Sequence, residues 1–190
     1  MSNASGKYQK KLGDLAGLYL DQDAFETLCR ERGDCVVYDV TDHRTTESRG
    51  DLIFGVTRMS PGQIGTEYYL TRGHIHARAN RPETYRGEAG HGLMLMESPE
   101  GETRIIEVHP HTICYVPPFW IHRSINVGQT DLVMSFCYPS DAGQDYSVIA
   151  KTGGMKTRIV ANGIEWQAIP NTRYRPRSAA DIQAIYDTAD

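Results

Sequence analysis

Three histidines and one glutamate are spaced along this chain in a way that can place four ligands around one metal ion. His74 and His76 are two residues apart, so their imidazoles project from the same face if the segment is a β-strand. Glu83 follows a six-residue gap that contains asparagine and proline, which is enough for a turn onto a neighbouring strand. His122 comes later, after an apolar strand-like run and a pair of prolines. The pattern, rather than any one of these residues, predicts a metal site.

This ligand set indicates both the kind of metal and the kind of chemistry. Three imidazole nitrogens and one carboxylate oxygen suit Fe, Mn, Ni, Zn or Cu better than Mg or Ca. An ion of six-coordinate habit would keep two positions for water or substrate, which predicts catalysis or at least ligand exchange. We therefore expect one divalent transition metal per chain.

Composition narrows the class of protein. A chain of 190 residues suits one domain with a sizeable core. The net charge of −4 comes from interspersed charges without a basic stripe, so neither nucleic acid nor an anionic membrane is an expected partner. Residues 1–11 are polar and lack the apolar core of a signal peptide, and the four cysteines form no CxxC pair. We expect a cytoplasmic protein with reduced thiols.

The elements that must position these ligands are mostly strands, with helices expected at the two ends. Residues 21–32 predict a helix capped by Asp21 and followed by Gly33, and residues 178–187 predict another, capped by Ser178. Asn162-Gly163 is the strongest hairpin signal. Strands are predicted at residues 36–41, 52–59, 65–71, 83–88, 91–97, 103–108, 112–116, 122–126, 133–138, 157–161 and 164–168.

Many short strands with ligands on nonadjacent ones predict an all-β fold, an antiparallel barrel or jelly roll whose mouth holds the site. Within one domain, we divide the chain into an N-terminal extension with a short helix (1–34), a barrel (35–170) and a C-terminal segment with a helix (171–190).

The same residues resemble the motifs of the cupin superfamily. His-x-His and Glu83 precede Gly90 as in the first cupin motif, and Pro117, His122 and Asn126 have the spacing of the second. Over residues 12–167 the chain more closely resembles the cupin-type phosphoglucose isomerase family. That likeness rests on Thr71-Arg-Gly-His-Ile-His-Ala77, Arg81-Pro-Glu-Thr-Tyr85, Tyr115-Val-Pro-Pro-Phe-Trp-Ile-His-Arg123 and Tyr138-Pro-Ser-Asp-Ala-Gly-Gln-Asp-Tyr146.

This resemblance implies a role for each candidate site residue on an antiparallel cupin jelly-roll barrel. The family's metal ligands fall on His74, His76, Glu83 and His122. Its phosphate-binding groups fall on Thr57, Thr71, the backbone of Gly73, and Tyr146, and its sugar-contacting tyrosines on Tyr38, Tyr85 and Tyr138.

The activity that the resemblance implies is metal-dependent interconversion of glucose 6-phosphate and fructose 6-phosphate by a homodimer, in glycolysis and gluconeogenesis. Iron is the first choice of metal, with manganese, nickel and zinc as alternatives. Glu83 is the natural base of a proton-transfer route, whereas in a hydride-shift route the metal acts mainly as a Lewis acid. A carboxylate bound to a cation is a weakened base, and the sequence leaves both routes open.

Four positions depart from the family pattern. Gln144 stands where the family has a histidine, and an amide can hydrogen-bond but cannot titrate. Arg72 replaces a usual lysine, which keeps the positive charge but changes its geometry. His91 and His111 replace glycines, so positive φ is expected at both.

Two other classes of function compete with this interpretation. One is a cupin enzyme with another reaction: an isomerase or epimerase of a different sugar phosphate, or an iron-dependent dioxygenase, which would need no phosphate-binding threonines. The other is a noncatalytic protein that binds a metal and a sugar phosphate, an interpretation that Gln144 favours.

Overall fold

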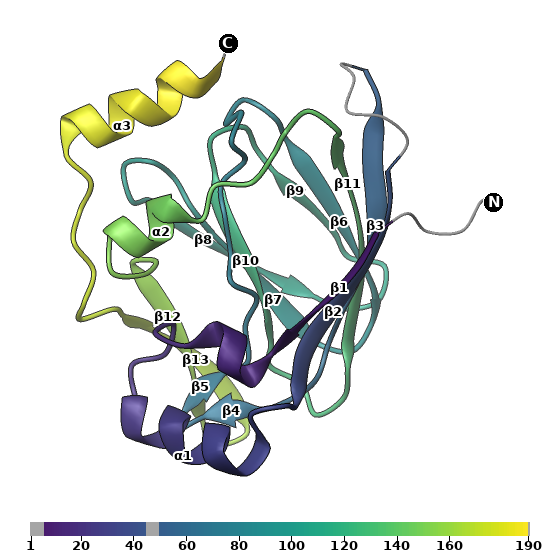
Figure 1. Ribbon diagram of the computed structural model, residues 1–190, viewed down its shortest axis with the longest axis vertical. Helices are drawn as coiled ribbons and strands as arrows, with labels where there is room; N and C mark the ends of the chain where they lie inside the picture. The colour runs from purple at the N-terminus through teal and green to yellow at the C-terminus, as the bar shows by residue number, and fades with distance from the viewer. Residues whose placement is uncertain (1–5, 45–49, 190) are drawn as a thin grey trace.

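A computed structural model describes residues 6–44 and 50–189, and it shows a barrel of antiparallel strands with short helices around it (Figure 1). The expected all-β fold, the antiparallel cupin jelly roll, is confirmed. None of the helices among the described residues is long and apolar enough to cross a membrane.

Six strands form the larger wall of the barrel. Their order across the sheet is β1-β2-β3-β11-β6-β9, and every neighbouring pair is antiparallel. Their bounds are β1 Gly6–Lys11, β2 Val36–His43, β3 Leu52–Met59, β11 Leu132–Pro139, β6 Glu83–Ala89 and β9 Ile113–Val116.

A three-stranded sheet faces this wall across the barrel, in the order β10-β7-β8 (Figure 1). Its strands are β10 Ile121–Asn126, β7 Gly92–Glu97 and β8 Thr103–Val108. Met59 and Met134 of the large sheet and Met94 of the small sheet belong to one buried core and are fully inaccessible to solvent. The apolar interior therefore joins the two walls and fixes the strands that carry His122 and Glu83.

The remaining elements form a third, four-stranded sheet and a peripheral layer of helices. The sheet has the order β13-β12-β5-β4, with strands β12 Thr157–Asn162, β13 Glu165–Pro170, β5 Glu67–Tyr68 and β4 Gln63–Ile64. The helices are α1 Gln22–Arg32, α2 Ser147–Lys151 and α3 Ala179–Tyr186, with 3-10 turns at Leu12–Leu15 and Asp187–Ala189.

The predicted terminal helices are confirmed with their caps. The Asp21 side chain accepts a hydrogen bond from the Ala24 amide at 2.9 Å, and Ser178 and Asp181 form a capping box at the start of α3. Gly33 ends α1 with a φ of −56°, so the left-handed conformation of many helix ends is not used there. A Cβ at Gly33 would lie 2.5 Å from the Cys29 carbonyl oxygen, which explains the glycine.

Several predicted elements differ from the observed ones. Helices were expected only at the ends, but α2 lies between barrel strands, and β1 was not predicted at all. The strand expected at 65–71 is broken, because Gly65 has a φ of +56° and turns the chain between β4 and β5. The hairpin at Asn162-Gly163 is confirmed, with Asn162 paired to Glu165 and the two-residue loop one position later than expected.

The C-terminal segment is tied to the barrel by a buried ion pair. Arg177 donates to a carboxylate oxygen of Glu97 at 2.8 Å, and their side chains are 2% and 0% exposed. The Lys156 amide and the Tyr174 hydroxyl also donate to Glu97, at 2.6 and 3.3 Å. A buried carboxylate that loses its cation is strongly destabilising, so this contact fixes the path of the segment.

We expect Arg177→Met to lower the free energy of unfolding by about 3 kcal/mol, because the Glu97 carboxylate would stay buried without its cation. Arg58→Met is the matched control, since its 3.4 Å pair with Asp131 is exposed and worth less than about 1 kcal/mol. Urea unfolding of both variants measures the difference, and equal losses would contradict a special contribution from Arg177.

Candidate metal centre and substrate cavity

The backbone brings His74 and His122 together. The two residues form an isolated antiparallel bridge in which His74 N donates to His122 O at 3.1 Å and His122 N donates to His74 O at 2.9 Å. The strand expected for the His-x-His pair is reduced to isolated bridges, with Ile75 paired to Asp145. The rings of His74 and His122 are 4.5 Å apart between centroids, so the strand of the small sheet and the loop before β6 share one centre.

Glu83 is the point on which two of the histidines converge. It is the first residue of β6, and its Oε2 lies 2.9 Å from His122 Nε2 and 3.3 Å from His76 Nε2. His76 Nδ1 lies 2.7 Å from the Arg81 carbonyl and His122 Nδ1 lies 3.3 Å from the Trp120 carbonyl. A carbonyl can only accept, so each Nδ1 carries the proton and each Nε2 presents a lone pair.

This arrangement fits a bound cation. Two imidazole lone pairs and a carboxylate oxygen repel one another unless a positive charge lies among them. The Nε2 atoms of His74 and His76 are buried and have no hydrogen-bond partner among the described residues. One ligand atom from each of His74, His76, Glu83 and His122 lies within 4.8 Å of the others, so the four predicted ligands come together as the sequence suggested.

Burial and neighbouring charges set the protonation of the centre. Burial raises the pKa of the Glu83 carboxyl, but the neighbouring His122 and His76 rings outweigh burial and hold that pKa well below its usual range. Burial and the nearby His122 hold the pKa of His74 well below its ordinary value of 6.5. Glu83 and His74 are therefore deprotonated at neutral pH, as metal binding requires.

A cavity inside the barrel opens onto this centre. It is lined by Glu83, His74 and His122 from the candidate ligand set, while His76 lies behind them. Every predicted substrate residue lines the same cavity, namely Tyr38, Thr57, Thr71, Gly73, Tyr85, Tyr138 and Tyr146.

Tyrosine rings surround the histidines on the cavity side. Tyr138 lies 5.4 Å from His76, Tyr85 5.9 Å from His122 and Tyr146 6.0 Å from His74, measured between ring centroids. Burial raises the pKa of Tyr138 to about 12, and burial together with the Glu83 charge raises the pKa of Tyr85 well above its ordinary value. These phenols stay protonated and can donate hydrogen bonds to sugar oxygens.

The same cavity also offers donors suited to a phosphate. Thr71 Oγ1 accepts from the Ser124 amide at 3.0 Å, which leaves its own O–H free to donate. Gly73 has a φ of +73°, and a Cβ there would lie 3.0 Å from the His122 carbonyl and 2.9 Å from Arg123 Nε. Glycine at position 73 is thus required by the close approach of the loop to β10.

The structure shows the contacts or the backbone conformation of each residue that departs from the family pattern. Gln144 lines the cavity and accepts a hydrogen bond from the Tyr146 hydroxyl, while the Arg72 guanidinium lies 4.5 Å from the Tyr146 ring centroid. His111 has the expected positive φ, 75°. The expectation for His91 was wrong, because His91 is not among the described residues with positive φ.

Sequence reasoning missed several residues that line the cavity. The alternation of side chains along a strand could have identified three of them. Each lies two residues from a predicted site residue on the same strand; they are Val40, Ser124 and Phe136. The same spacing continues from Tyr38 and Val40 to Asp42 on β2, whereas no comparable pattern marks Tyr8, Arg44 and Arg123. Two further lining residues, Arg72 and Gln144, are the ones already noted as departures from the family pattern.

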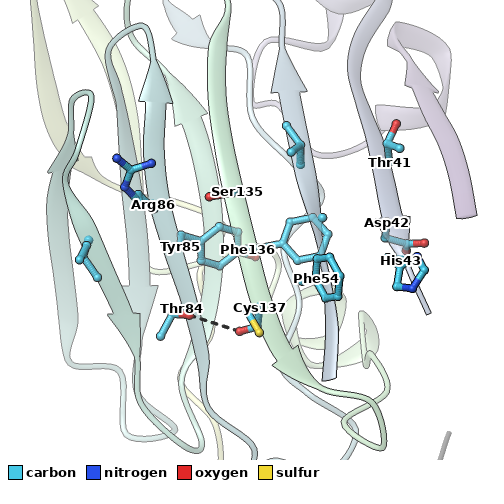
Figure 2. Close-up of a pocket in the computed structure, with 13 residues that line it drawn as sticks. Thr41, Asp42, His43, Phe54, Thr84, Tyr85, Arg86, Ser135, Phe136 and Cys137 are labelled. Carbon is cyan, nitrogen blue, oxygen red and sulfur yellow. Dashed lines mark hydrogen bonds between the residues drawn. The ribbon is translucent and has the colours of Figure 1, made fainter. Parts of the chain in front are cut away.

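A second hollow lies on the outer face of the six-stranded sheet, away from the histidines. Figure 2 shows its lining on β2, β3, β6 and β11, with Phe54 beside His43 and Thr84 beside Cys137. Large apolar side chains are exposed around it, including Phe54 (43%) and Ile113 (71%). This face resembles a surface made for contact with another protein more than a site for polar substrates.

The comparisons with known proteins agree along most of the chain. A family model described as "Glucose-6-phosphate isomerase (GPI)" matches residues 9–177. "Putative glucose-6-phosphate isomerase 1" of Rhizobium meliloti (strain 1021) is 56% identical over 98% of this chain and 87% of its own length. "Glucose-6-phosphate isomerase" of Thermococcus litoralis is 43% identical over 83% of this chain and 82% of its own. A solved Klebsiella pneumoniae protein with a double-stranded β-helix domain matches with a TM-score of 0.44 at 18% identity, covering 56% of this chain and 80% of that one.

We expect the chelator-treated protein to lose stability as the pH falls below about 6.5, because the unfolded chain takes up a proton at His74 that the folded chain resists. The free energy of unfolding should fall by up to about 1.4 kcal/mol per pH unit from this group. His74→Asn should flatten the dependence, whereas the exposed His111→Asn, a residue type that tolerates the left-handed conformation, should leave it unchanged. Urea unfolding between pH 5 and 8 checks this, and identical slopes in all three proteins would refute it.

Proposed function

The chain belongs to the glucose-6-phosphate isomerase family, and we propose that it interconverts glucose 6-phosphate and fructose 6-phosphate with a divalent metal held by His74, His76, Glu83 and His122. One observation carries this proposal: three histidines and one glutamate come together beside a cavity, and the lining of that cavity, which includes His74, Glu83 and His122, also carries a set of phosphate-suited donors. A bound metal would supply Lewis acidity, polarising the carbonyl and the neighbouring hydroxyl of the open-chain sugar.

Binding of the phosphate group at one end of the cavity would hold the substrate in a fixed orientation. The neutral donors that suit a phosphate dianion are Thr71, Thr57 and the Gly73 amide. The Tyr146 hydroxyl would join them by turning its O–H away from Gln144, and Arg72 adds positive charge beside Tyr146. Anchoring the phosphate at this end directs C1 and C2 of the sugar toward the histidines. Three tyrosines of the cavity lining then hydrogen-bond to the sugar hydroxyls and orient the sugar; they are Tyr38, Tyr85 and Tyr138.

Glu83 is the group placed to move a proton. In a proton-transfer route its carboxylate takes the hydrogen from C2 of the aldose as H+ and returns it to C1, and the reverse reaction uses the same group. The low pKa of Glu83 keeps it ionised and able to accept, though it makes Glu83 a weak base. In a hydride-shift route the hydrogen passes directly between the carbons, and Glu83 acts as a ligand alone.

Gln144 determines whether the groups around Tyr146 can exchange protons with a substrate. The amide oxygen accepts from the Tyr146 hydroxyl, so it orients that phenol, but it cannot exchange a proton near neutral pH. Ring opening of the substrate therefore relies on other groups or on water. A noncatalytic protein that binds a sugar phosphate is the competing function that Gln144 favours, as is an isomerase or epimerase of another sugar phosphate.

We also infer that the outer face of the six-stranded sheet joins two copies of this chain in a homodimer. The exposed apolar side chains of β3 alternate as Leu52, Phe54 and Val56, and Ile113 and Tyr115 of β9 extend the patch across the same sheet. A twofold axis through such a patch pairs it with itself. Iron as the native metal, a cytoplasmic location and a part in glycolysis and gluconeogenesis are further proposals from the sequence.

We expect chelator-stripped protein to regain conversion of fructose 6-phosphate to glucose 6-phosphate when Fe, Mn, Ni or Zn is added. Glu83→Gln should lower the turnover number about 100-fold or more, because it removes both a ligand charge and the proton acceptor. A coupled assay measures the product. Metal binding without turnover by the wild-type protein would refute the isomerase and favour the binding role or another sugar phosphate.

We expect wild-type protein to sediment at twice its 21.3 kDa chain mass, and Ile113→Lys to sediment as a monomer, because a buried charge disrupts an apolar interface. Ile164→Lys is the matched control, since Ile164 is fully exposed in the β12–β13 loop, away from this face. Analytical ultracentrifugation distinguishes them, and a monomeric wild type would contradict the dimer.

A further inference from the structure

A second group of metal-ligating side chains lies outside the cavity, at the far end of the small sheet. His91 and His109 stand with Glu107, and one ligand atom of each lies within 4.8 Å of the others. The Glu107 Oε2 atom is 3.5 Å from His91 Nε2 and 3.3 Å from His109 Nε2. The function proposed above uses none of these residues.

The strand register explains why these three side chains meet. Gly92 and Val108 form the last paired residues of the β7–β8 ladder, so His91 and His109 are the next residues on either strand. Glu107 is two residues before His109 and therefore projects from the same face. Met96, which pairs with His122, is five residues along β7 from His91, so this cluster is about 16 Å along the strand from the first centre.

The two imidazoles lie close enough to share a cation once one ring turns. The two rings are stacked with centroids 4.3 Å apart and an angle of 12° between their planes. Both Nε2 atoms face the same carboxylate oxygen, and His91 Nε2 is buried without a hydrogen-bond partner among the described residues. Tetrahedral zinc holds two nitrogens about 3.4 Å apart and binds each in the plane of its ring, so His109 must turn out of the stack to share an ion with His91. The side chains of His109 and Glu107 are 54% and 51% exposed, which leaves both free to turn.

We propose that His91, Glu107 and His109 form a second, noncatalytic site for a divalent transition metal such as zinc. Two neutral imidazoles and one carboxylate offset one of the two charges of the ion, which leaves room for water or an anion at an open position. Because His91 precedes β7 and His109 follows β8, a bound ion ties the two strand ends together. The site is independent of the proposed isomerase activity.

The test is a count of zinc bound by chelator-stripped, full-length protein, by equilibrium dialysis with metal analysis. We expect two equivalents per chain for the wild type, one for His109→Ala and one for His122→Ala. His111→Ala is the matched control, because His111 lies two residues from His109 but outside the cluster, and it should retain two. Glu107→Gln supplies a second variant on an exposed side chain, and it should weaken the second equivalent at least 10-fold.

One equivalent in the wild type, or two in both His109→Ala and Glu107→Gln, would overturn the second site and leave these residues as a hydrogen-bonded surface cluster. Isomerase activity distinguishes this failure from that of the proposed function. His109→Ala should turn over sugar phosphate at the wild-type rate at saturating metal. If the zinc counts match the expectation but neither the wild-type protein nor any variant is active, the second metal site is supported and the isomerase proposal is refuted.

Discussion

The central constraint in this molecule is that two imidazole lone pairs are held within 3.3 Å of one carboxylate oxygen, away from water. Each imidazole is fixed by a backbone carbonyl on its other nitrogen, so neither ring can relieve the repulsion by moving its proton. Such a cluster is favourable only with a positive charge inside it. The barrel must supply the rigidity that keeps the lone pairs together.

The two sheets meet that requirement from opposite sides. Glu83 comes from the large sheet and His122 from the small one, and the His74–His122 backbone bridge connects the loop before β6 to β10. The same bridge brings Gly73 so close to β10 that an added Cβ would lie 3.0 Å from the His122 carbonyl, and it places Gly73 at the cavity wall. The geometry of the candidate metal ligands and that of the candidate phosphate donors therefore depend on one contact.

Sequence reasoning grouped the four residues that cluster in the structure because a spacing of two residues and a gap long enough for a turn are local signals. It placed most strands for the same reason, since alternation of apolar residues is visible within each strand. It missed β1, whose sequence is largely polar and which exists through pairing of its backbone with β2 at the sheet edge. It missed α2 because five residues are too few to show helical periodicity. Contacts that join distant segments, such as Arg177 with Glu97, leave no local pattern.

The loop between His76 and Glu83 is also held by residues that lie far along the chain from it. The Ala79 amide donates to the Thr188 hydroxyl at 3.2 Å, and Phe119 packs on Tyr186 with ring centroids 4.9 Å apart. During synthesis, the ribosome completes all four candidate ligands more than sixty residues before it reaches Thr188. The nascent chain thus has its ligands early and gains this contact with their loop only later, so the contact steadies ligands that have already been synthesised.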